Sequence, residues 1–198
     1  MPAGEPLATS PFHQFRDWMA EAEKSEANDP NAMSVATSTL NGRPSVRIVL
    51  LKSLDERGFV FYTNKGSRKG EELLANPNVA LLFHWKSLQR QVRIEGRVEH
   101  VSDSEADAYY ASRLRISRLG AWASEQSRPL ASRKVLEERL AEVERRFPDE
   151  IPRPNYWSGY RVLPESLEFW QDMPYRLHDR TIYRRSASGT WEQSKIFP

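Results

Sequence analysis

The alternation of apolar and polar positions predicts a chain built mainly from short antiparallel strands. Residues 33–40 and 45–51 have strand patterns, and Asn41-Gly42 between them is a typical hairpin turn. The pattern in residues 91–101 alternates most regularly, so one face of this strand is expected to be apolar. Further strands are expected over residues 59–63, 79–85, 156–162, 168–170, 177–184 and 191–196.

Helical patterns lie between some of these strands. Ser10-Pro11 is a good helix start, because serine caps the first turn and proline fits its first position. Ser102 and Glu105 form a capping box that begins another helix. Helices are expected over residues 11–27, 68–74, 103–113 and 133–147, while residues 114–129 are expected to be irregular.

Many short strands with three or four helices predict a fold that is mainly β with flanking helices (α+β), an antiparallel barrel with the helices packed outside. The β-α rhythm of a doubly wound sheet and the glycine fingerprint of dinucleotide folds are both missing from the sequence. No internal repeat or linker interrupts the pattern. We therefore expect one domain over residues 1–198, with a flexible N-terminus over residues 1–10.

Composition narrows the possible functions. The chain has 198 residues, a net charge of +2 and no cysteine, so disulfides and thiolate chemistry are excluded and nucleic acid is not required as a partner. Its four histidines lack metal-binding spacing, so no metal site is expected. Without a signal peptide or an apolar run long enough to cross a bilayer, the sequence predicts a cytoplasmic protein with no membrane partner.

Three segments carry candidate anion-binding groups. Ser67-Arg68-Lys69 opens a helix, where free N–H groups and two cations suit a phosphate; the alternative is an ordinary cap with solvated cations. Tyr109, Arg113 and Ser117 share a face if their helix continues, and the alternative is a surface ion pair with a core tyrosine. Arg47 and Lys52 bracket four apolar residues at opposite strand parity, which weakly indicates two separate anion sites.

The last candidate is the segment from Leu167 to Arg180. In an extended strand, Arg176, His178 and Arg180 would point to one face and form a row of hydrogen-bond donors. The alternative is a solvated edge strand whose charges prevent aggregation. The Phe169-Trp170 pair favours binding, because aromatic pairs are more often buried or stacked than left in water.

The motif Leu-Glu-Phe-Trp-Gln, four variable residues and Arg-Leu-His-Asp-Arg over residues 167–180 resembles the C-terminal signature of pyridoxine (pyridoxamine) 5'-phosphate oxidases. The similarity covers nearly the whole chain from Asp29 onward. It implies an antiparallel Greek-key split β-barrel that binds FMN. It also implies a homodimer with FMN in a cleft between the subunits.

The resemblance assigns roles to the candidate residues. Arg176 and His178 are implied over the substrate ring as the catalytic pair, and Lys52, Tyr109, Arg113 and Ser117 around the substrate phosphate. The implied FMN contacts are Arg47, Ile48, Val49, Leu50, Leu51, Lys52, Tyr62, Thr63, Arg68, Lys69, Gln91, Gln126, Ser127, Trp170 and Arg180.

The implied reaction is oxidation of pyridoxine or pyridoxamine 5'-phosphate to pyridoxal 5'-phosphate, in vitamin B6 metabolism. FMN would take a hydride and O2 would reoxidise it, giving H2O2. The proton acceptor stays open between His178 and Asp29. The sequence departs from the family at Arg118, where glutamine is common, and in its short segment before the first helix.

Three alternatives remain beside the oxidase. A phenazine-type flavin oxidase would act on another ring, and the phosphate-binding set argues against it. A carrier that only binds FMN or pyridoxal phosphate would use the same residues, so only turnover separates it from an enzyme. A nucleic-acid-binding barrel would need aromatic residues interleaved with the basic residues of 91–97, and these are missing.

Overall fold

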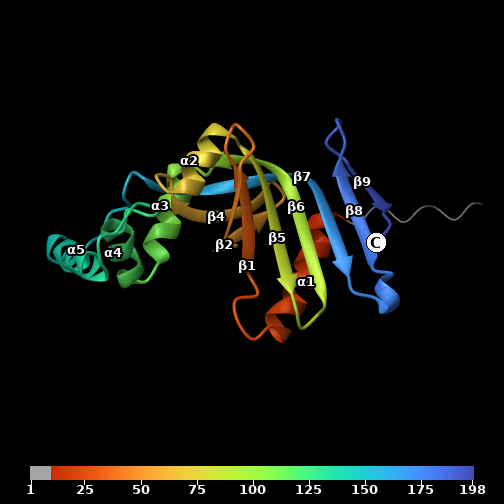
Figure 1. Cartoon of the computed structure of the whole chain (residues 1–198), viewed down its shortest axis with the longest axis horizontal. Helices are drawn as coiled ribbons and strands as arrows, with labels where there is room; N and C mark the ends of the chain where they lie inside the picture. Colours follow the sequence, from red (N-terminus) through yellow and green to blue (C-terminus); the bar gives the residue numbers. More distant parts are fainter. Residues whose placement is uncertain (1–9) are drawn as a thin grey trace, which may run out of the picture.

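In the computed structural model, which describes residues 10–198, every strand pairing is antiparallel and the strands form one curled sheet (Figure 1). The strands are β1 (Ala32–Ser38), β2 (Pro44–Leu50), β3 (Ser53–Asp55), β4 (Gly58–Asn64), β5 (Asn78–Trp85), β6 (Arg90–His100), β7 (Trp157–Gln171), β8 (Asp179–Arg185) and β9 (Trp191–Lys195). The helices are α1 (Pro11–Ser25), α2 (Arg68–Ala75), α3 (Asp103–Ser112), α4 (Arg115–Ala123) and α5 (Arg133–Arg146), with a short 3-10 turn, η1 (Pro174–Arg176). The expected fold class is confirmed.

The long strand β7 divides the sheet into its two halves. The sheet runs in the order β2-β1-β5-β6-β7-β4-β3, and β8 also pairs with β7. The first half of β7 pairs with β4 and its second half with β8, while β6 pairs along the other edge from Tyr160 to Gln171. The β6–β7 register shifts at Gly96, where an added Cβ would lie 2.1 Å from the Leu163 carbonyl oxygen, so this close approach requires glycine. The irregular pairing at this register shift lets the sheet curl.

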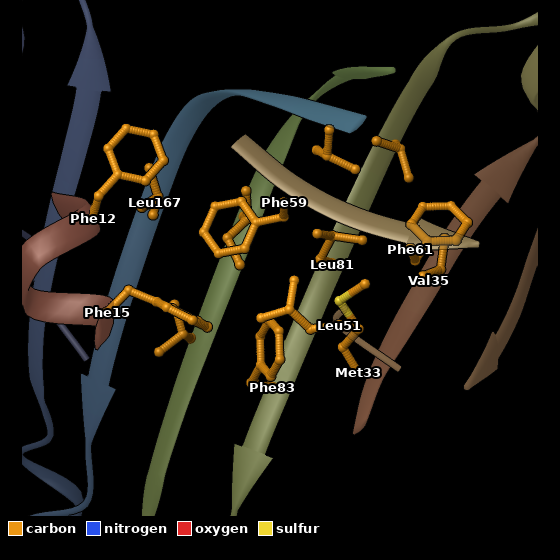
Figure 2. Close-up of a cluster of buried hydrophobic side chains, with 14 of the residues drawn as sticks. Phe12, Phe15, Met33, Val35, Leu51, Phe59, Phe61, Leu81, Phe83 and Leu167 are labelled. Atoms are coloured by element: carbon orange, nitrogen blue, oxygen red, sulfur yellow. The ribbon is translucent and has the colours of Figure 1, made fainter. Parts of the chain in front are cut away.

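Helix α1 closes one face of the sheet with aromatic side chains (Figure 2). Phe15 packs edge-on against Phe59 of β4 at 4.9 Å and against Phe83 of β5 at 5.0 Å, measured between ring centroids. Val92 and Ile94 of β6 are fully buried, so the apolar face predicted for this strand is confirmed. Burial of such side chains stabilises the fold by roughly 1.5–3 kcal/mol each.

Helices α3, α4 and α5 gather at one end of the molecule, away from the β8–β9 hairpin at the other (Figure 1). The capping box that predicts α3 is present, with the Ser102 hydroxyl accepting from the Glu105 N–H and the Glu105 carboxylate accepting from the Ser102 N–H. Over residues 10–198, no helix is both long and apolar enough to cross a membrane. Residues 1–9 of the segment expected to be flexible lie outside the described residues.

Two sequence-based element predictions are wrong. Residues 115–123 form α4 instead of an irregular segment. Its N-cap residue, Leu114, makes no capping hydrogen bond with its side chain. Burial of Leu119 and Ala123 stabilises the helix instead. The strands predicted over 156–162 and 168–170 are one continuous strand, β7. Pro164 between them lies opposite Gly96 at the register shift, where the ladder is already irregular.

Candidate functional site

A cleft of about 810 Å³ opens between β2, β4, α2 and the α3–α4 end of the molecule. We call it the charged cleft, because five of its lining residues are cationic and none is acidic: Arg47, Lys52, Arg68, Lys69 and Arg113. Most of the predicted ligand-binding residues line it, the others being Ile48, Val49, Leu50, Tyr62, Thr63, Tyr109, Ser117, Gln126 and Ser127. A concave site with one sign of charge attracts anions.

One end of the charged cleft is built on the start of α2. Ser67 caps the helix by accepting from the Gly70 N–H, so Arg68 and Lys69 occupy its first turn. Gly70 is required there, because an added Cβ would lie 2.1 Å from the Lys65 carbonyl oxygen. The loop can therefore pack closely under the helix N-terminus, where the free N–H groups and the positive end of the helix dipole favour a bound anion.

Lys69 is buried among neutral acceptors. Its Nζ donates to Thr63 Oγ1 at 2.9 Å, to Gln126 Oε1 at 3.1 Å and to Ser67 Oγ at 3.3 Å, and its exposed fraction is 6%. Burial, together with the nearby positive charge of Arg47, lowers the pKa of Lys69 to about 8. A buried ammonium group without a carboxylate partner is stabilised by an anionic ligand.

The other end of the charged cleft is an aromatic stack with an arginine on it. Tyr62 stacks on Tyr109 at 4.0 Å and on Trp157 at 5.4 Å between ring centroids. The Arg113 guanidinium lies 4.8 Å from the centroid of the Trp157 ring, and its buried Nη1 has no hydrogen-bond partner among the described residues. Burial also lowers the pKa of Arg113. An unpaired buried N–H group of this kind is a candidate anion ligand.

The continuous helix that would align Tyr109, Arg113 and Ser117 is absent. Helix α3 ends at Ser112 and Arg113 has an extended backbone, so Ser117 belongs to α4. All three side chains nevertheless line the charged cleft. The three residues therefore lie on the same cleft without the continuous helix that would have placed them on one face.

A second, smaller cavity of about 270 Å³ lies on the sheet surface that faces away from α1. We call it the sheet-face cavity; it is lined by Leu82, Gln91, Arg93, Glu168, Trp170 and Arg180. Arg180 Nε donates to Glu168 Oε1 at 2.7 Å, and this bond raises the pKa of Arg180. Arg93 also pairs with Glu168, which is buried. Three predicted FMN contacts thus lie here, outside the charged cleft.

The same face of the sheet continues to β2 and connects the two sites. Direct cross-strand partners share a face, and the register joins Ile48, Ser34, Leu82, Arg93 and Glu168 in one row. Ile48 is 63% exposed, an apolar side chain on an edge strand with nothing packed over it among the described residues. Such a face is suited to contact with another protein surface.

The predicted row of Arg176, His178 and Arg180 is wrong. Arg176 belongs to η1 with a φ of 61°, and β8 begins only at Asp179, so the three side chains do not alternate along one strand. His178 instead lies 4.6 Å from the Trp170 ring, centroid to centroid, with its Nδ1 2.9 Å from Asp172 Oδ1. The turn places Arg176 in solvent, outside both cavities.

Some other residues that the sequence assigned to the site lie outside it in the structure. Leu51 is in the core, 8% exposed, and does not line the charged cleft. Asp29, the alternative proton acceptor, lines neither cavity. Sequence reasoning missed Trp157, whose ring supports Arg113, and Glu72, which contacts two cleft arginines. Glu72 could have been found from the sequence, because it lies four residues after Arg68 and would pair with it on the same helix face.

Comparison with known proteins shows the family to which the chain is related. A family model described as pyridoxamine 5'-phosphate oxidase matches residues 19–147, and one described as the pyridoxine 5'-phosphate oxidase C-terminal dimerisation region matches residues 157–198. The pyridoxine/pyridoxamine 5'-phosphate oxidase of Gluconobacter oxydans is 65% identical over 193 residues, covering 97% of this chain and 96% of that protein.

Two solved structures resemble the whole chain. PhzG from Burkholderia lata, in complex with tetrahydrophenazine-1-carboxylic acid, is 31% identical with a TM-score of 0.91, covering 100% of this chain and 99% of that one. A pyridoxamine 5'-phosphate oxidase-related, FMN binding protein from Nostoc punctiforme is 16% identical with a TM-score of 0.78, covering 97% and 100%. The second likeness concerns the fold alone, and the expected split-barrel architecture is confirmed.

Proposed function

Since the chain belongs to the pyridoxamine 5'-phosphate oxidase family and is an FMN-dependent oxidoreductase, we propose that it oxidises pyridoxine 5'-phosphate and pyridoxamine 5'-phosphate to pyridoxal 5'-phosphate. O2 is the proposed electron acceptor and H2O2 the by-product. The observation that carries the proposal is the charged cleft, which has a set of cationic side chains at each end and no carboxylate among the described residues that line it. Two phosphorylated ligands would account for both groups.

The end built on α2 suits the phosphate of FMN. Arg68 and Lys69 lie in the first turn of the helix, Arg47 is close enough to influence Lys69, and Gln126 and Thr63 share the Lys69 ammonium group. Helix N–H groups and three cations together favour a phosphate monoester. The backbone and side chains of β2 would then lie along the rest of the cofactor.

The aromatic end suits the phosphate of the substrate. Arg113 offers an N–H group that has no partner among residues 10–198, and Tyr109, Ser117 and Lys52 also line the charged cleft. Fixing the phosphate holds the remote end of the substrate, and this lowers the entropic cost of placing its reacting carbon. When bound, FMN accepts the hydride from that carbon and supplies the electrons that reduce O2.

The remaining assigned residues require a second subunit. Gln91, Trp170 and Arg180 line the sheet-face cavity, and Arg176 and His178 lie next to it in sequence and outside the charged cleft. The family's C-terminal dimerisation region covers the last four of these residues. We propose that FMN lies at the subunit interface, where the partner's sheet face closes the charged cleft and brings the Arg176–His178 turn over the substrate ring. A cytoplasmic location stays a prediction.

Absorbance spectroscopy of the purified protein tests the proposal. A flavin spectrum that bleaches when pyridoxine 5'-phosphate is added without oxygen, and returns with stoichiometric H2O2 when air is admitted, is the expected result. If the flavin spectrum bleaches only with a ring substrate that has no phosphate group, a phenazine-type oxidase would be favoured. A flavin spectrum unchanged by any of these substrates would identify a carrier, and no flavin binding after FMN is supplied would contradict the proposal as a whole.

A further inference from the structure

Glu72 is a buried carboxylate directly behind the charged cleft. It lies on α2, one turn after Arg68, and only 5% of its side chain is exposed. It does not line the cleft itself, yet it contacts two arginines that do. Arg68 Nε donates to Glu72 Oε1 at 2.9 Å, and Arg47 Nη2 lies 3.5 Å from Glu72 Oε2.

Hydroxyl groups complete the surroundings of Glu72. Thr37 of β1 and Ser45 of β2 both donate to its Oε2. The same two hydroxyl oxygens accept from Arg47, Thr37 Oγ1 from Nη1 and Ser45 Oγ from Nη2, each at 2.6 Å. Burial opposes ionisation of Glu72, but the bonds from Ser45, Thr37 and Arg68 outweigh it and lower its pKa to about 2. The carboxylate is therefore ionised at neutral pH.

Glu72 is the sole carboxylate that pairs with Arg47 or Arg68 among residues 10–198. The two guanidiniums repel each other across the cleft wall, and burial of Arg47 adds to the cost. A shared buried carboxylate offsets both effects and fixes the direction of each planar guanidinium group. Arg68 remains 53% exposed and Arg47 20% exposed, so their outer edges stay free for a ligand.

The charges at this end of the charged cleft also match one kind of ligand. Arg47, Arg68 and Lys69 against Glu72 leave an excess of two positive charges. A phosphate monoester carries about −1.5 to −2 charges at neutral pH. A neutral hydroxyl group, as at the end of an unphosphorylated flavin, would leave the excess uncompensated.

We propose that Glu72 is a positioning residue that holds Arg47 and Arg68 in the geometry for a phosphate group, and that it thereby sets the preference for FMN over riboflavin. The inference rests on the proposed function, since it assumes that the flavin phosphate binds at this end. Without Glu72, the two arginines separate and the preference for the phosphorylated flavin falls. The affinity for riboflavin, which has no phosphate, stays nearly the same.

The test is a titration of flavin-free protein with FMN and with riboflavin, followed by quenching of flavin fluorescence. Glu72→Gln keeps the side-chain shape and removes the charge, and it is expected to weaken FMN binding about 10-fold to 100-fold. Riboflavin binding should change less than about 3-fold by the same reasoning, because the bonds to the phosphate are the ones lost. Glu71→Gln is the matched control, since Glu71 pairs with Arg128 on the surface and does not line the charged cleft.

Glu72→Asp covers the case in which the glutamine variant does not fold. Aspartate keeps the charge but its side chain is one methylene group shorter, so it cannot reach both arginines, and an intermediate loss of FMN preference is expected. Equal weakening for both flavins in either variant would indicate a purely structural role, and unchanged or tighter FMN binding would equally overturn the inference. If the wild-type protein itself shows no preference for FMN, the proposed function fails together with the inference.

Discussion

The charged cleft and the sheet-face cavity differ in how many of their cationic groups have a carboxylate partner. In the charged cleft, no lining residue is acidic, and the Lys69 ammonium and Arg113 Nη1 face neutral groups or no partner among the described residues. In the sheet-face cavity, Arg93 and Arg180 both pair with the buried Glu168. Cations left unpaired in a cleft are costly unless a ligand neutralises them. The charged cleft is thus organised for an anion, whereas both arginines of the sheet-face cavity already have a carboxylate partner.

This difference suggests different contributions to ligand binding. The charged cleft would supply most of the affinity, because charge-assisted hydrogen bonds to a phosphate are roughly twice as strong as neutral ones. The sheet-face cavity, with Trp170 beside two arginines that share a carboxylate, would supply packing area and exclude water when a second subunit is present. Single substitutions in the two cavities should separate these contributions.

The largest effect is expected from Lys69→Met in the charged cleft. The substitution keeps the length of the buried side chain but removes the ammonium group that Thr63 and Gln126 hold. FMN affinity should fall by about 100-fold, because a charge-assisted bond to the phosphate is lost. Equilibrium dialysis of FMN against the variant would measure this.

Lys134→Met is the control for Lys69→Met, since Lys134 is 82% exposed on α5 and does not line the charged cleft. It should bind FMN as the wild type does. If both lysine variants retain wild-type affinity, the charged cleft does not hold the flavin phosphate, and the comparison between the two cavities loses its basis.

The next effect concerns Arg176, which lies outside both cavities. Arg176→Ala should lower kcat about 10-fold to 100-fold, because the guanidinium is proposed to orient the substrate ring. FMN should remain bound, since no contact of Arg176 with either cavity is present in this chain. Steady-state kinetics with the flavin content measured on the same sample checks both statements; loss of the flavin would contradict the assigned role.

A smaller effect is expected in the sheet-face cavity. Arg180→Ala leaves Glu168 with Arg93 as its ionic partner, so the cavity keeps a balanced charge pair. FMN affinity should therefore fall less than about 10-fold, the range of a single rim contact. The same dialysis experiment compares it directly with Lys69→Met. A loss as large as that of the lysine variant would show that the two cavities contribute equally.

Much of this arrangement follows from local sequence signals. The Asn41-Gly42 turn, the Ser102 capping box and the alternation in residues 91–101 each depend on neighbours along the chain, and the structure contains all three elements. The cations at the start of α2 were predictable for the same reason, because a cap and its helix lie within a few residues.

Other features depend on tertiary contacts that no local pattern encodes. Helix α4 begins at Leu114 without a capping side chain, and burial of Leu119 stabilises it. Tyr175 and Arg176 both have positive φ values without being glycine, so the turn that removes Arg176 from the strand must be imposed by its surroundings. Glu168 meets Arg180 only through the β7–β8 register, and Glu72 meets Arg47 only after α2 packs against β1 and β2.

The smallest predicted effect is the pH dependence of FMN binding, and it occurs only in the charged cleft. The pKa of Lys69 in the free protein is lowered to about 8, so the group loses its proton as pH rises through this value. A bound phosphate stabilises the ammonium form and raises its pKa, so binding takes up a proton above pH 8 and affinity falls as pH rises. Between pH 7 and 9, FMN affinity should fall about 3-fold to 10-fold, which is the linkage expected for one group. The Lys69→Met variant should bind FMN weakly but with nearly constant affinity over this range, whereas Arg180→Ala should keep the wild-type slope. A wild-type FMN affinity that does not change with pH would show that the Lys69 ammonium group does not interact with the phosphate. Arg47 and Arg68 alone would then account for the electrostatic attraction of the phosphate.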